Sequence, residues 1–184
     1  MNKCSRSCVS VLRRLAENEE ETILDAVLDS MEAIKRRYAN TEHVDILLSL
    51  MQKAIDLSYS ELDDLDAIHL LGEGWVAEET LAIAIYCALK YPTNIEKALI
   101  AAVNHGGDSD STGAVTGNIL GASLGVNGIP QKFIDNLELS DVILEVADDL
   151  YNDCKMSEYS DYYDPVWEEK YIKMIYPKVR ERLQ

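Results

Sequence analysis

A short turn past the middle of the sequence gathers five side chains that carry oxygen: Asp108, Ser109, Asp110, Ser111 and Thr112. Carboxylates and hydroxyls are hard ligands, and a set without His or Cys favours Mg²⁺, Ca²⁺ or Mn²⁺ over zinc. The two carboxylates can share or bridge ions while a hydroxyl fills a further position. Helix capping by Asp or Ser, worth about 1 kcal/mol, is the alternative, but it accounts for one such residue better than for five. The spacing predicts a site for a hard divalent cation.

Two known motifs resemble this turn in sequence, but in each case a residue that the motif requires is absent. An EF-hand loop needs a bidentate Glu at its twelfth position, and the twelfth residue counted from Asp108 is Ile119. A phosphate-binding P-loop needs Gly-Lys-Ser/Thr before its helix, and no lysine lies between Lys97 and Lys132. Both interpretations are rejected.

Nucleophilic catalysis at the same turn would require a base beside a serine hydroxyl. His105 is close in sequence to Ser109 and Ser111. A catalytic triad is defined by geometry, however, and adjacency in sequence does not supply it. No catalytic residue is therefore assigned from the sequence.

The elements that must position this turn all have helical periodicity. From Glu19 to Ala39, apolar residues recur at three- and four-residue intervals, with acidic residues at the start and basic residues at the end, as the helix macrodipole favours. The stretch Ala77 to Tyr91 is apolar on nearly every side, which predicts a buried central helix. No segment has the pattern of a strand, so the predicted fold is an all-α helical bundle. Further helices are expected over Glu42–Ser58, Ser60–Leu71 (with Ser60 as N-cap and Gly72 as its stop), Thr93–Val103 (with Thr93 as N-cap), from Pro130, over Ser140–Cys154 and over Trp167–Leu183.

Glycine recurs every fourth residue after the acidic turn, at Gly113, Gly117, Gly121 and Gly125. At this spacing the glycines lie along one face of a helix. Each costs about 1 kcal/mol relative to alanine, so the stripe predicts a close approach to the helix backbone. Close packing of another helix is the simpler interpretation, and a bound ligand is the alternative.

Charge and hydropathy exclude several kinds of partner. The chain has 17 basic and 33 acidic residues, a formal net charge of −16. This charge repels nucleic acid polymers and anionic lipid at long range, so neither is expected as a partner. No run approaches the ~18 apolar residues of a membrane span. The expected location is the cytoplasm.

The cysteines indicate no disulfide framework. Cys4, Cys8, Cys87 and Cys154 are few and scattered, and Cys87 lies in an apolar stretch where a thiol packs as a small hydrophobe. The pair Cys4 and Cys8 lacks a second pair of ligands for a metal, so we treat both as incidental.

Two segments carry a family resemblance. Asn104–Ala114, followed by a helix of small residues, resembles the C-terminal signature of the ADP-ribosylglycohydrolases, and Gly72–Glu79 is similar to a loop of that family that borders the ADP-ribose pocket. The resemblance covers about Glu42 to Gly125. It implies an all-α fold with a binuclear magnesium centre, and hydrolysis of the bond from ribose C1″ to a modified side chain or of a related ADP-ribosyl linkage.

The resemblance also implies individual roles. Asp108, Asp110 and Ser111 match the metal-binding Asp-x-Asp-Thr of the family, with Ser111 in place of threonine. The residues implied for ADP-ribose are Gly72, Gly74, Trp75, Gly107 and Ser109. A helix C-cap is the alternative for Gly72, and a place in the core is the alternative for Trp75.

The first half of the family pattern is not found in the sequence. Family members carry there a Gly-Asp-Ala/Ser segment and a Ser/Thr-Asp-Asp-Thr motif, which supply further metal ligands. We therefore expect one partial domain over residues 1–184, with a variable N-terminal segment over 1–18 and a Tyr-rich C-terminal tail and helix over 156–184.

Three functions follow from this expectation. The chain is a hydrolase completed by another chain, a remnant that binds metal or ADP-ribose without catalysis, or a helical protein that binds other proteins. The partners expected are ADP-ribose or an ADP-ribosylated target, together with a second copy of the chain or a complementing N-terminal half.

Overall fold

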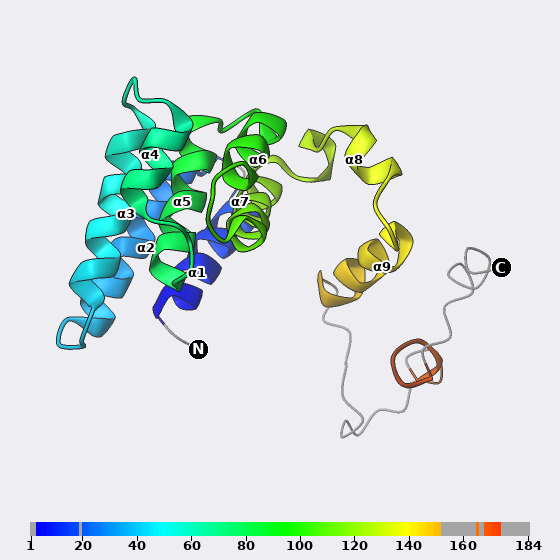
Figure 1. The fold of residues 1–184 in the computed structure, drawn as a ribbon. Coiled ribbons are helices and arrows are strands. Elements are labelled where there is room, and N and C mark those ends of the chain that lie inside the picture. Colours follow the sequence, from blue (N-terminus) through cyan, green and yellow to red (C-terminus); the bar gives the residue numbers. More distant parts are fainter. Residues whose placement is uncertain (1–2, 19, 152–164, 166–167, 174–184) are drawn as a thin grey trace. The chain divides into compact units, whose positions relative to one another are not determined.

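The computed structural model describes residues 3–18, 20–151, 165 and 168–173. The chain forms two compact units, Met1–Pro130 and Gln131–Gln184, and each is described by itself (Figure 1). Every regular element in these ranges is helical, which confirms the all-α prediction. The single domain expected over 1–184 stays a prediction. Within the ranges that the structure describes, no helix is long and apolar enough to span a membrane.

The first unit is a helical bundle (Figure 1). It consists of α1 (Lys3–Glu17), α2 (Ile23–Tyr38), α3 (Val44–Ser58), α4 (Asp64–Leu71), α5 (Ala77–Lys90), α6 (Ile95–Val103), α7 (Ser109–Leu124) and the 3₁₀ turn η1 (Val126–Gly128). The predicted helices from Glu19 to Val103 are thus present, with ends shifted by a few residues.

Helix α5 is the centre of this bundle. Leu81 to Ala88 are all buried, so this helix has no face toward water in its middle. It packs against α3 on one side and α7 on another, and it also contacts α6, α1 and α4. The predicted buried central helix is confirmed. Because α7 packs against α5, this helix helps to position α7 and the turn that begins it.

Helix α1 (Lys3–Glu17) belongs to the core and lies within the segment that we expected to be a variable N-terminal one. Helix α1 buries Cys4, Ser7, Val11 and Leu15, which recur every three or four residues. The Ser7 and Ser30 hydroxyls hydrogen-bond at 2.7 Å between α1 and α2. Two of the four buried positions are Cys and Ser rather than large apolar residues, which concealed the stripe in the sequence.

Two of the predicted helix caps are wrong by one to three residues. The N-cap of α4 is Asp63, whose Oδ1 accepts the Leu65 N–H at 2.9 Å, because the Ser60 hydroxyl instead donates to the Leu57 carbonyl. The N-cap of α6 is Asn94 rather than Thr93, and its Oδ1 accepts the Lys97 N–H at 3.0 Å.

The glycine stripe of α7 has more than one role. A Cβ on Gly113 would lie 2.6 Å from Val103 Cγ1 of α6, so close helix packing is confirmed at this position. A Cβ on Gly117 would make an ordinary contact, 3.8 Å from Leu99 Cδ2, and one on Gly121 would meet nothing within 4 Å. Gly125 ends the helix with φ +64°.

The second unit contains α8 (Gln131–Asp135), α9 (Ser140–Tyr151) and the π-helical turn η2 (Glu168–Ile172). The predicted helices from Pro130 and Ser140 are present. Most of the expected helix Trp167–Leu183 and of the Tyr-rich tail lies outside the described residues. Lys170 of η2 forms an ion pair with Glu145 of α9 at 2.8 Å.

A carboxylate links α4 to the central helix. The Tyr86 and Tyr91 hydroxyls both donate to Asp64, each at 2.7 Å. The hydrogen bond to Asp64, followed by burial, raises the pKa of Tyr91 to about 12. Burial and the same carboxylate also raise the pKa of Tyr86. Both phenols are therefore held in their protonated form in the folded chain.

Alkaline pH is expected to destabilise the fold through these phenols. An unfolded Tyr ionises near pH 10, and folded Tyr91 keeps its proton to about pH 12, so its contribution is complete below pH 10 and is lost as the pH rises to 12. Urea unfolding at several pH values measures this slope. Tyr91→Phe should make the slope shallower, and an unchanged slope would contradict the assignment.

Candidate functional site

The acidic turn begins α7, one of the helices that pack against the central helix α5. Asp108 is the N-cap residue, yet its carboxylate makes no capping hydrogen bond. Asp110 Oδ1 accepts the N–H of the following Ser111 at 2.8 Å. The capping alternative therefore does not account for the side chain of Asp108, whose oxygens are not used to cap the helix.

The two carboxylates of the turn interact with each other. A hydrogen bond with the Asp108 side chain is the main cause that lowers the pKa of Asp110, and the Ser111 backbone N–H adds to it. Because its pKa is lowered, the exposed Asp110 side chain is ionised at neutral pH. Such paired oxygens on an exposed turn are the kind of ligand that a hard cation takes.

A backbone contact holds the turn in place. The Asp108 N–H donates to the Glu73 carbonyl at 2.8 Å, which joins the turn to the loop after α4. A Cβ on Gly107 would lie 1.8 Å from the same carbonyl oxygen. Only glycine permits this approach, so the observed role of Gly107 is to let the two loops meet. We call the contact the Glu73–Asp108 bridge.

The loop between α4 and α5 is braced by a carboxylate that we did not predict. Glu79 Oε2 accepts the N–H groups of Gly74 at 3.0 Å and of Glu73 at 3.2 Å. Gly72 and Gly74 both have positive φ, +127° and +81°. Gly72 ends α4, which confirms its C-cap interpretation.

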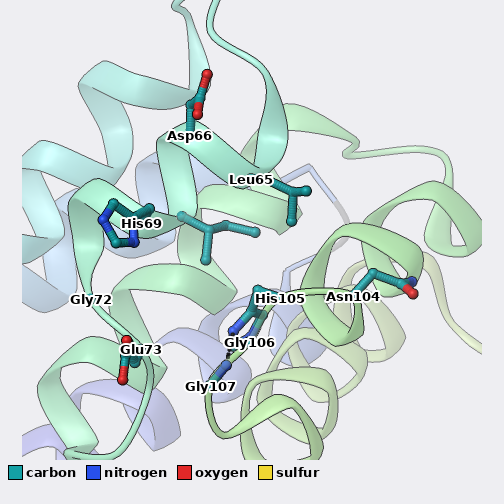
Figure 2. A pocket seen from close by; sticks show the side chains of 10 residues that line it. Leu65, Asp66, His69, Gly72, Glu73, Asn104, His105, Gly106 and Gly107 are labelled. Carbon is teal, nitrogen blue, oxygen red and sulfur yellow. Dashed lines mark hydrogen bonds between the residues drawn. The ribbon is translucent and has the colours of Figure 1, made fainter.

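His105 is a brace rather than a base for a serine. Its Nδ1 accepts the Gly107 N–H at 3.2 Å (Figure 2), so Nε2 carries the proton and donates to Thr112 Oγ1 at 2.9 Å. The Thr112 hydroxyl then donates to the Ala102 carbonyl at 2.7 Å. Both ring nitrogens are thus engaged, and neither serves Ser109 or Ser111.

Four of the predicted site residues share one cleft of about 580 Å³, which we call the Trp75 cleft. Helices α1, α5 and α7 and the loop after α4 form its walls. Gly74, Trp75, Asp108 and Ser111 line it together with Cys4, Ser5, Cys8, Val9, Leu12, Ala77, Thr80, Leu81, Val115 and Asn118.

Trp75 is exposed rather than buried. Its side chain has 67% of its surface accessible, so the alternative that places it in the core is wrong. The indole N–H donates to the Glu73 carboxylate at 3.1 Å, which ties the ring to the loop. An anchored, accessible aromatic ring at a cleft provides a surface on which a planar group stacks.

The other predicted residues lie elsewhere. Gly72 and Gly107 line a second cleft of about 360 Å³ with His69, Glu73 and His105 (Figure 2). Ser109 and Asp110 line neither cleft. The Glu73–Asp108 bridge contributes residues to both clefts, since Glu73 lines the second and Asp108 the first.

The acidic turn and the braced glycine loop both lie in a region that matches a known protein family. The profile of the ADP-ribosylglycohydrolases matches residues 4–159. The chain belongs to the ADP-ribosylglycohydrolase family. The match begins at Cys4, so α1 belongs to the matched region.

Three relatives illustrate the range of similarity within and around the family. A protein named ADP-ribosylarginine hydrolase Tri1 from Serratia proteamaculans is 29% identical over 63% of this chain and 30% of its own length. An uncharacterised protein of Archaeoglobus fulgidus is 29% identical over 78% of this chain and 42% of its own. The ADP-ribosyl-[dinitrogen reductase] glycohydrolase of Rhodospirillum rubrum is 43% identical over 24% of this chain and 15% of its own.

This chain spans less than half the length of these relatives. No solved structure matched it. The family assignment therefore rests on the sequence profile and these relatives.

The oxygen donors of the turn fit part of a magnesium shell. Asp108 and Asp110 supply adjacent carboxylates, and Ser111 adds a hydroxyl at the wall of the Trp75 cleft. In the portion of the chain that the structure describes, no group of three or more His, Cys, Asp or Glu side chains suits a metal ion. Mg²⁺ takes six oxygens, so water or further ligands would complete the shell of an ion held here.

The geometry also shows a bracing residue and two cleft residues that the sequence interpretation missed. Glu79 lies within the segment that resembles the family loop, but its contacts with backbone N–H groups are visible only in three dimensions. Cys4 and Cys8 were treated as incidental, although their four-residue spacing places both on one side of α1, at the Trp75 cleft.

Gly107→Ala is expected to destabilise the fold by about 2 kcal/mol or more, because its Cβ cannot coexist with the Glu73 carbonyl and the Glu73–Asp108 bridge must open. Gly106→Ala is the matched control, since a Cβ there meets nothing within 4 Å. Urea unfolding of both variants measures the difference. Equal free energies of unfolding of the two variants would show that the Glu73–Asp108 bridge does not require glycine at position 107.

Proposed function

We propose that this chain forms the ADP-ribose and Mg²⁺ binding part of a hydrolase that removes ADP-ribose from a modified target. The observation that carries the proposal is the Trp75 cleft, which brings an exposed indole and a glycine to the same cavity as Asp108 and Ser111. The name of the Serratia proteamaculans relative, ADP-ribosylarginine hydrolase Tri1, supports the substrate class.

Asp108, Asp110 and Ser111 would hold the ion, because the side chains of Asp108 and Asp110 interact and Ser111 lines the same cleft as Asp108. When bound, Mg²⁺ would neutralise negative charge and polarise oxygen ligands. The carboxylates of Asp108 and Asp110 would orient the ion and its water, and the Glu73–Asp108 bridge keeps Asp108 in place. Holding two reactants in the correct orientation can supply a large part of the rate enhancement of an enzyme.

The remaining walls of the cleft would bind the nucleotide. The Trp75 ring offers a flat face for an adenine or a ribose, and Gly74 lets a ligand approach the backbone without a Cβ. The linkage that we propose as substrate is the glycosidic bond between ribose C1″ and the guanidinium of an ADP-ribosylated arginine. This assignment follows the name of the Serratia proteamaculans relative.

A second candidate is binding of the same ligands without hydrolysis. It is favoured by the donor set, since the described part of the chain contains no third acidic side chain grouped with Asp108 and Asp110 for a metal. In that case a second copy or another chain would complete the shell, or the protein would bind ADP-ribose alone.

Mg²⁺ and ADP-ribose together are expected to raise the thermal midpoint. A ligand at 100 times its Kd adds about 2.7 kcal/mol to the stability of a folded chain. Asp110→Asn should abolish the part of the shift due to Mg²⁺, because it removes a charged ligand. Glu32→Gln, on an exposed position of α2, is the control and should keep the full shift. A full shift in Asp110→Asn would contradict the metal assignment.

Release of free ADP-ribose separates the two candidates. Incubation of the chain with an ADP-ribosylated arginine peptide and Mg²⁺, followed by chromatography, should show ADP-ribose that is absent in Asp110→Asn. Ligand-dependent stabilisation without any release would favour the binding protein over the hydrolase.

A further inference from the structure

The α1 wall of the Trp75 cleft carries two thiols that the proposed function does not use. Cys4 and Cys8 both line this cleft, and both are free cysteines. They lie four residues apart in α1, which places them on one side of the helix. The apolar side chains around them include Val9, Leu12 and Val115.

The four-residue spacing of Cys4 and Cys8 determines which covalent link can join their sulfur atoms. Cβ atoms of helical residues four apart are about 5–6 Å from each other. A disulfide requires about 3.5–4.5 Å between its Cβ atoms, so a direct bond between the sulfurs would distort α1. A single atom inserted between the two sulfurs lengthens the link and suits the regular helix.

The surroundings favour a product without charge. Burial, followed by the charge of Glu78 and a hydrogen bond to it, raises the pKa of Cys4 to about 11, and burial raises the pKa of Cys8. Thiolates are therefore disfavoured at this wall, and a reagent that leaves two negative sulfurs would meet an acidic neighbour. A reagent that replaces both S–H bonds by neutral bonds avoids this cost.

We propose that Cys4 and Cys8 form a dithiol site in the Trp75 cleft for trivalent arsenicals, in which one arsenic atom bridges both sulfurs. The step is a condensation: R–As(OH)₂ reacts with two thiols to give R–As(SR′)₂ and two molecules of water. Two As–O and two S–H bonds break, while two As–S and two O–H bonds form. The oxidation state of arsenic does not change, so no reductant or oxidant is required.

The cavity has room for an organic substituent on the arsenic. The volume of about 580 Å³ and the side chains of Leu12 and Val115 suit an aryl group. Asp108 and Ser111 line the same cavity, so an arsenical held by α1 occupies space beside the acidic turn. If the proposed function holds, the arsenical therefore competes with ADP-ribose, and this last consequence alone rests on that function.

Phenylarsine oxide, which hydrates to the reactive form, tests the site. The full chain with Cys154→Ala should bind one phenylarsenic group and lose two titratable thiols, as measured by intact mass and thiol titration. Cys4→Ser and Cys8→Ser in that background should each bind at least about 100-fold more weakly, because the second thiol no longer closes the chelate. Cys87→Ala is the matched control and should bind normally, since Cys87 is fully buried in α5.

A release experiment on the chain with all its α1 thiols keeps the test independent of how the variants fold. Ethanedithiol should remove the bound phenylarsenic group, whereas 2-mercaptoethanol at the same thiol concentration should not. Equal release by both reagents, or undiminished binding in a folded Cys8→Ser variant, would overturn the dithiol site. Arsenical binding that fails to displace ADP-ribose would overturn only the competition. Because the binding assay contains no ADP-ribose, failure of the proposed function leaves its result unaffected.

Discussion

The contact on which the rest of the site depends is the hydrogen bond from the Asp108 N–H to the Glu73 carbonyl. It joins two loops that are distant in sequence, one after α4 and one before α7. Gly107 makes it possible, because any Cβ there would overlap the carbonyl oxygen. Through this bond Asp108 and the Trp75 loop are brought to the same cleft. The helices fix the ends of both loops, and the bridge joins the two loops to each other.

Around the bridge, polar contacts replace the apolar packing of the bundle. Glu79 holds the N–H groups of the Trp75 loop, and His105 connects the turn to the buried Thr112. Each uses its hydrogen-bonding groups on the protein itself, so their role is to position. Asp108 differs, since its carboxylate does not cap the helix that it begins. Its side chain lines the Trp75 cleft and is one of the metal ligands that we propose.

Much of the bundle could be predicted because apolar periodicity is a local property. The buried helix at Ala77 has apolar residues on every side, and its extent matches the structure closely. Helix α1 was missed because Cys4 and Ser7 fill core positions without a strong apolar signal. The motifs also identified Trp75, Asp108 and Ser111, which meet in one cleft. The Glu79 brace depends on how the loop before α5 folds back on that helix, and the place of the two cysteines depends on the packing of α1 against α5 and α7. The residue pattern alone shows neither.

We infer that the Glu73–Asp108 bridge holds the acidic turn in the position that binds the metal. Calorimetric titration of Mg²⁺ in the presence of ADP-ribose, into the original chain, Gly106→Ala and Gly107→Ala, tests it most directly. Working below the unfolding temperature of every variant separates affinity from stability. The affinity should be unchanged in Gly106→Ala and at least about tenfold weaker in folded Gly107→Ala, a difference of about 1.4 kcal/mol. Equal affinities in the three proteins would contradict it.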